Sequence, residues 1–132
     1  MRLSIAIAAT ALAFLILDAI WLGVVAKDFY RQQIGHLLAP DFRLGPAILF
    51  YLVYLGGVSW FALAPAAAGG DWRAALLPAA ILGFVAYATY DLTNWAVMRD
   101  WPAVVTVADI AWGTVLTTVA AGVGAYLAQR WG

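Results

Sequence analysis

The residues of this chain that could do chemistry are three aspartates in otherwise apolar segments, Asp18, Asp91 and Asp109. An ionisable group at membrane depth costs on the order of 3 kcal/mol on insertion scales, so a sequence that keeps three of them has a use for them. Burial and like-charged neighbours both favour the protonated form of a carboxyl, and such a group can bind a proton or a cation. Each aspartate is followed within four positions by a tryptophan, namely Trp21, Trp95 and Trp112.

The composition indicates that these aspartates lie in membrane-spanning helices. Apolar residues make up 66% of the 132 residues and charged residues only 11%, whereas a soluble domain has roughly 25% charged residues. The mean hydropathy is +0.91. Seven basic residues balance seven acidic ones, so no basic surface suggests a nucleic-acid partner. The absence of cysteine excludes disulfides and thiolate metal sites.

Four apolar runs, at residues 3–26, 45–68, 74–98 and 103–128, are each long enough to cross the hydrocarbon core as a helix. We expect residues 1–132 to form a single integral membrane domain, an all-α, compact antiparallel four-helix transmembrane bundle. The first run is expected to be a retained helix rather than a cleaved signal. Small residues four apart, Ala79 with Gly83 and Ala120 with Gly124, would let the helices approach closely in lipid.

The antiparallel topology places the three aspartates in one layer. Asp18 and Asp91 lie near the ends of the first and third spans and Asp109 near the start of the fourth, so all three face the same side of the membrane. At 1.5 Å per residue, each lies about 9–12 Å in from that side. Tyrosines of the second span and helical neighbours of Asp91 enter the same layer. The candidate binding residues are Asp18, Tyr51, Tyr54, Tyr87, Asp91, Asn94 and Asp109, supported by Trp21, Trp95 and Trp112.

The connection between the first two spans, residues 27–44, is the only long one. Tyr30, Ile34, Leu37 and Leu38 recur in it at helical spacing, with basic and amide side chains mostly elsewhere around the turn. This pattern is typical of a helix lying in the membrane interface. Such a helix would cover the side toward which the aspartates lie and could act as a lid.

Structural roles compete with functional ones for these residues. A protonated aspartate can join two helices through a hydrogen bond worth ~0.6–2 kcal/mol, although three like-charged groups in one layer are a poor way to join helices. His36 is expected to be a solvated residue of the interfacial segment rather than a ligand or base. Trp72, Trp101 and Trp131 fall at span ends, where indoles anchor helices in the headgroup region, so they are interpreted as boundary markers.

Catalytic motifs are missing from the sequence. It has no HExxH, GxSxG, P-loop or CxxC pattern. An enzyme would have to work through the carboxyl cluster alone, so the sequence favours a binding protein over an enzyme and names no catalytic residue. A site of aspartates alone is also a weak prediction of a metal centre, and we expect no metal or cofactor.

Four segments, LDAIWLG, FYRQQIGHLL, YDLTNWA and VTVADIAWGT, together resemble a family of small bacterial four-span membrane proteins, largely alphaproteobacterial, known only as a domain of unknown function. The resemblance covers essentially the whole chain, and the combination of these motifs is fairly specific. It implies a multi-pass protein of the bacterial inner membrane and supplies no established activity.

The sequence therefore predicts a proton-linked intramembrane binding site for a lipid or a hydrophobic small molecule, surrounded by membrane lipids. Two alternatives stay open. The protein could be a non-catalytic accessory or assembly subunit of a larger membrane complex, in which the aspartates and tryptophans fix helix contacts. It could also be a small exporter that works as an antiparallel homodimer, an analogy that rests on size and span number.

Overall fold

The structure, a computed structural model, describes residues 2–132, and every regular element within them is helical. Four stretches are long and apolar enough to cross a membrane, which confirms the all-α prediction with four membrane-length helices. The first comprises α1 (Arg2–Ile20) and the π-helical turn η1 (Trp21–Val25); the second α3 (Leu44–Val58), η3 (Ser59–Leu63) and α4 (Ala64–Gly69); the third η4 (Trp72–Ala75) and α5 (Leu76–Val97); the fourth α6 (Ala103–Trp131).

The connection between the first two spans carries the short helix that its amphipathic pattern predicts. Helix α2 (Lys27–Ile34) runs into a 3-10 turn, η2 (Gly35–Leu37), and Pro40 follows, where a helix could not continue. Ile34 is buried against Trp101 and Val105, so the apolar face of α2 packs on the end of the bundle. Leu38, which the spacing places on this face, lies beyond the last helical turn and is exposed.

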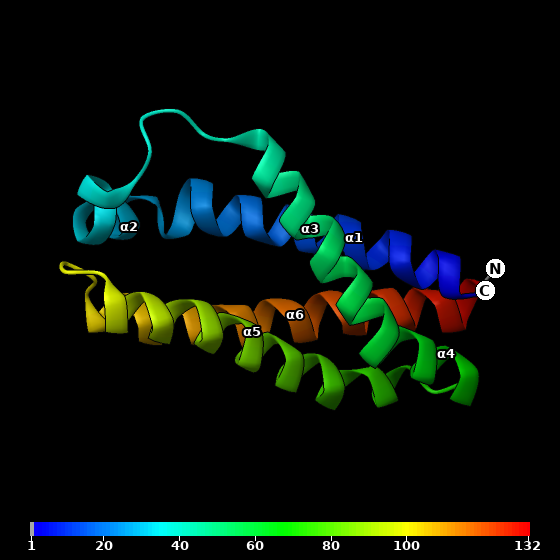
Figure 1. Ribbon diagram of the computed structural model, residues 1–132. Coiled ribbons are helices and arrows are strands. Elements are labelled where there is room, and N and C mark those ends of the chain that lie inside the picture. Colours follow the sequence, from blue (N-terminus) through cyan, green and yellow to red (C-terminus); the bar gives the residue numbers. More distant parts are fainter. Residues whose placement is uncertain (1) are drawn as a thin grey trace.

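Helix α6 lies between α1 and α5 and packs closely on both (Figure 1). The close approach depends on the small residues that the sequence marks. A side-chain carbon built on Gly83 of α5 would come within 2.6 Å of the Gly113 carbonyl oxygen in α6. One built on Gly124 of α6 would come within 2.6 Å of the Ala6 carbonyl oxygen in α1. Larger side chains at these positions would force the helices apart.

Helix α3 departs from the antiparallel alignment expected of a compact bundle. It crosses the other helices obliquely, and its first turns stand away from them (Figure 1). Within Leu44–Val58 only Tyr54 and Val58 are buried. Lipid tails solvate an exposed leucine as well as a protein interior does, so no hydrophobic force presses the first half of α3 onto its neighbours.

The two ends of the molecule differ. The chain termini meet at one end (Figure 1), where Gly132 lies beside Arg2, and most of the apolar core is in that half. Helix α2 covers the opposite end, which we call the α2 end. The end of α5 and the start of α6 also reach the α2 end, whereas α3 begins nearer the middle of the molecule (Figure 1).

Candidate functional site

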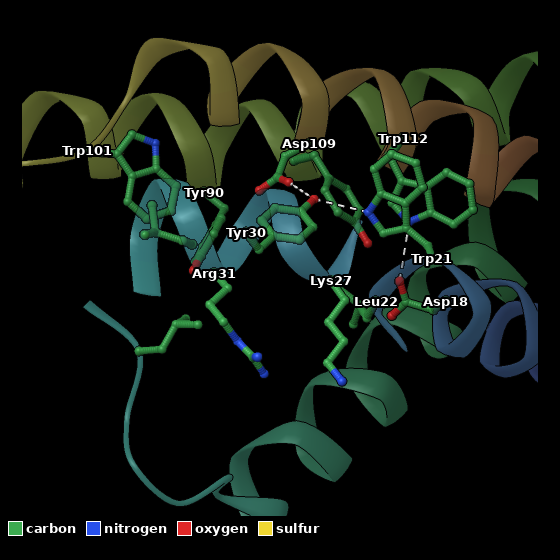
Figure 2. A pocket seen from close by; sticks show the side chains of 13 residues that line it. Asp18, Trp21, Leu22, Lys27, Tyr30, Arg31, Tyr90, Trp101, Asp109 and Trp112 are labelled. Atoms are coloured by element: carbon green, nitrogen blue, oxygen red, sulfur yellow. Dashed lines mark hydrogen bonds between the residues drawn. The ribbon is translucent and has the colours of Figure 1, made fainter. Parts of the chain in front are cut away.

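A cavity of about 410 Å³ lies under α2, between that helix and the ends of α1, α5 and α6 (Figure 2). We call it the α2 cavity. It contains two of the three carboxyls, together with aromatic and basic side chains. Its lining residues are Asp18, Trp21, Leu22, Lys27, Tyr30, Arg31, Ile34, Leu38, Tyr87, Tyr90, Trp101, Asp109 and Trp112.

Asp18 of α1 accepts hydrogen bonds from two other spans. The Tyr51 hydroxyl of α3 donates to its Oδ2 at 2.7 Å, and the Trp112 indole N–H of α6 donates to its Oδ1 at 3.3 Å. Trp21, three residues along the same span, donates to Tyr30 instead, so the indole that bonds to Asp18 comes from another span and not from its neighbour in the sequence. Asp18 thereby connects α1, α3 and α6 at the floor of the cavity.

Asp109 of α6 is held by the lid. The Tyr30 hydroxyl of α2 donates to Asp109 Oδ1, and the Trp21 indole N–H donates to the Tyr30 hydroxyl oxygen at 3.1 Å (Figure 2). Burial, and next the hydrogen bond to the Asp109 carboxyl, raise the pKa of Tyr30 above its ordinary value. The phenol therefore keeps its proton at physiological pH and remains a donor to the carboxyl.

A pair of stacked indoles, Trp21 and Trp112, lies between the hydrogen bonds of Asp18 and those of Asp109. The rings of Trp21 and Trp112 lie 4.5 Å apart between centroids, with only 8° between their planes. Trp21 bonds toward the lid and Trp112 toward Asp18. The stack thus links the Asp18 and Asp109 groups into one network along the cavity wall.

Asp91 of α5 does not line the cavity. Its side chain is fully buried and, among residues 2–132, neither carboxyl oxygen has a hydrogen-bond partner. Helix α5 packs against α6, the helix that carries Asp109. Thr106 donates to the Asp91 backbone oxygen at 3.3 Å and accepts from the Trp101 indole at 3.0 Å. A charged carboxylate without a partner is very costly in such a place.

The remaining predicted residues separate into two groups. Tyr87 lines the α2 cavity, whereas Tyr54 lies deeper and shares a 2.7 Å hydrogen bond with the Thr117 hydroxyl. Asn94 and Trp95 do not line the cavity. Trp95 is 49% exposed because it lies near the end of α5, on a side that no other helix covers. An indole is well suited to the membrane interface there.

The three carboxyls do not share one site: Asp18 and Asp109 line the α2 cavity, and Asp91 does not. Nowhere in residues 2–132 do three His, Cys, Asp or Glu side chains converge closely enough to hold a metal ion. Asp18 accepts a hydrogen bond from Trp112 of the indole stack, and Asp109 is linked to Trp21 through Tyr30. Asp91 lies outside the cavity lining. The arrangement instead offers separate acceptors along an elongated cavity.

Sequence reasoning missed three kinds of residue at this site. Trp101, interpreted as a boundary marker, is only 7% exposed and lines the cavity. Tyr30 is the donor to Asp109, and its position on the inner face of the predicted lid was the signal that could have identified it. Lys27 and Arg31 line the mouth of the cavity, although the amphipathic pattern assigns them to the solvated face of α2.

The fold and the site define a class, that of α-helical multi-pass membrane proteins with a polar cavity under an interfacial helix. The chain belongs to the family described as "Predicted membrane protein (DUF2177)", whose profile matches residues 3–126. The resemblance inferred from the motifs is thereby confirmed. No curated protein and no solved structure matches the chain. The family description states membrane residence and no activity.

Proposed function

We propose that this protein binds an amphipathic ligand, a lipid headgroup or a hydrophobic small molecule, in the α2 cavity of a bacterial inner-membrane protein. The observation that carries the proposal is the cavity of about 410 Å³ that contains both Asp18 and Asp109. Ligand pockets are typically ~300–1,000 Å³, mostly apolar or aromatic, with a few polar groups that orient the ligand. The α2 cavity has this size and this mixture of side chains.

Two features support a link between binding and a proton. The carboxyls of Asp18 and Asp109 accept hydrogen bonds, and a donor on the ligand would compete with Tyr30 or Tyr51 for them. Asp91 is buried and neither of its carboxyl oxygens has a partner within residues 2–132, so its uncharged, protonated form is the one that can persist there. The protein therefore carries a proton-holding carboxyl on α5, next to the helix α6 that carries Asp109.

The lid provides a means of control. Helix α2 closes over the cavity. Within residues 2–132, two hydrogen bonds join it to the membrane spans, and both involve the Tyr30 hydroxyl, which donates to Asp109 and accepts from Trp21. A ligand that takes the place of Tyr30 at Asp109 would release α2. In this proposal, binding and lid opening are a single exchange of hydrogen bonds.

The test is mass spectrometry of lipids and metabolites that stay with the protein after purification in a mild detergent. We expect a retained amphiphile in the parent, its loss in Asp109→Asn, and at least as much of it in Tyr30→Phe, because that substitution removes the hydroxyl that competes with the ligand for Asp109. The matched control is Tyr126→Phe, which removes a hydroxyl from a half-exposed tyrosine at the opposite end. Equal ligand content in the parent, both cavity variants and the control would refute the proposal. A protein partner that copurifies in place of a ligand would favour an accessory subunit.

A further inference from the structure

Two cationic side chains at the α2 cavity form no ion pair within residues 2–132. Lys27 and Arg31 are four residues apart on α2, so they lie next to each other on one side of the helix. Both line the cavity and extend to the same side of α2 (Figure 2). Among residues 2–132, the ion pairs join other residues and neither of these two cations. Like charges at this spacing destabilise a helix, so an anion between them would be favourable.

A second, apolar space runs along the membrane span. It is a groove of about 170 Å³ between α1 and α3, and it is open because α3 crosses obliquely. Phe14 and Leu15 form its α1 wall, and Leu52, Leu55 and Val58 form its α3 wall. Apart from the hydroxyl groups of Thr10, Tyr51 and Tyr54, the lining is apolar and suits a hydrocarbon chain.

The cavity and the groove meet at one hydrogen bond. Asp18 lines the α2 cavity, Tyr51 lines the groove, and the Tyr51 hydroxyl donates to the Asp18 carboxyl. The two neighbouring spaces therefore differ in character: the α2 cavity offers charged and hydrogen-bonding groups, and the groove is mostly apolar. A membrane lipid has the same order of polarity, from headgroup to acyl chain.

We propose that this protein binds a phospholipid of net negative charge, with its phosphate between Lys27 and Arg31 and one acyl chain in the groove between α1 and α3. The inference rests on the binding function proposed above and specifies its ligand. The headgroup should carry hydroxyl groups, because Asp18 and Asp109 offer acceptors beside the cations. Phosphatidylglycerol has this combination of charge and donors, whereas the choline of phosphatidylcholine would add a third cation.

The test is native mass spectrometry of the full chain in detergent, titrated with dioleoylphosphatidylglycerol or with dioleoylphosphatidylcholine, which differ only in the headgroup. The variant Lys27→Gln/Arg31→Gln should bind phosphatidylglycerol roughly tenfold more weakly, since charge-assisted contacts to a phosphate are lost. Its control, Arg73→Gln/Arg130→Gln, removes two cations from the opposite end and should bind as the parent does.

The groove is tested with a second pair of variants on α3. Leu52→Trp fills the groove and should weaken the binding of both lipids, whereas Leu49→Trp, on the same helix but outside the groove lining, should not. Both positions are exposed, so neither substitution disturbs the core. Soluble glycerol phosphate is added as a competitor to separate a lipid from a free phosphate compound.

The outcomes are distinct. Unchanged phosphatidylglycerol binding in Lys27→Gln/Arg31→Gln would overturn the headgroup assignment. Displacement of the lipid by glycerol phosphate, with full binding in Leu52→Trp, would mean that a soluble anion is the ligand and would overturn the lipid assignment. A parent protein that binds neither lipid but retains another amphiphile would refute only this inference. A parent that retains nothing would refute the proposed function as well.

Discussion

The site is built from residues that are individually recognisable but paired across long distances in the chain. Asp18 and Asp109 stand out in the sequence because charge is rare at membrane depth. Their partners do not, since Tyr30 and Asp109 are 79 positions apart and Asp18 and Trp112 are 94 apart. Periodicity along one helix identifies which residues share a face. It carries no information on which residue of another helix will face them, and for this reason Trp21 could be assigned to the wrong aspartate.

The buried carboxyl of Asp91 leads to a spectroscopic prediction. Because it is fully buried and neither oxygen has a partner within residues 2–132, the uncharged form is the one that can persist there. Infrared spectra near neutral pH should contain a protonated-carboxyl band that disappears in Asp91→Asn. The control, Asp28→Asn, removes an exposed carboxyl of α2 and should leave the band intact. If no band is lost in Asp91→Asn, Asp91 is ionised, and the proton-linked site fails.

Tyr30→Phe should loosen the lid. The substitution leaves the Asp109 carboxyl and the Trp21 indole N–H without their shared partner, which costs about 1–3 kcal/mol for partly buried groups. The measurement is the thermal unfolding of the purified protein together with proteolysis of the α2 segment. Unfolding and cleavage indistinguishable from those of the parent would show that the hydrogen bond does not hold α2.

The same tyrosine gives the lid a dependence on pH. The folded-state pKa of Tyr30 is raised, while the unfolded phenol titrates near ~10. Its contribution to stability is therefore fully present below about pH 10 and is lost as the pH rises through the folded-state value. Stability measured against pH should fall more steeply above about pH 10 in the parent than in Tyr30→Phe. Parallel curves would contradict the assignment.

At the scale of elements, hydropathy predicts the helices, and packing decides how they sit. The apolar runs and the amphipathic connection specify four spans and α2 because helix formation in lipid follows from local sequence. The oblique crossing of α3 is a different matter. The crossing angle depends on contacts with α1 and α5, which the α3 sequence does not encode by itself. The groove between α1 and α3 results from that crossing. Trp95 shows the same limit, since its side of α5 is left uncovered.

Adding a single carbon at Gly83 should disrupt the close packing of α5 against α6. In Gly83→Ala, the new carbon would lie 2.6 Å from the Gly113 carbonyl oxygen and 2.9 Å from the Thr117 hydroxyl. The helices must move apart, at a cost of about 1–3 kcal/mol. Gly56→Ala on α3 is the control, because nothing lies within 4 Å of its new carbon. Thermal unfolding should separate the two variants, and equal stability would mean that α5 and α6 are not in close contact.

At the scale of the whole molecule, the two ends have different roles. The end with the chain termini is closed by small and aliphatic residues, among them Leu63, Ala79, Leu116 and Ala120, which are completely buried. The α2 end holds the carboxyls, the cations and the cavity. A rigid packed half thus supports a half in which α2 and the start of α3 have few contacts. Such an arrangement allows a ligand to enter sideways from the lipid without disturbing the core.

With four membrane crossings, the α2 end and the chain termini must face opposite sides of the membrane. The chain has no cysteine, so single cysteines can be labelled with a membrane-impermeant maleimide in oriented vesicles. Arg73→Cys lies at the end with the termini, and His36→Cys and Asp100→Cys lie at the α2 end, all with exposed side chains. We expect Arg73→Cys to react from one side only, and His36→Cys and Asp100→Cys to react only from the other. If Arg73→Cys and His36→Cys reacted from the same side, the chain would not cross the membrane four times. Asp18, Asp91 and Asp109 would then not lie at one depth, and neither the α2 cavity nor its ligand could be as proposed.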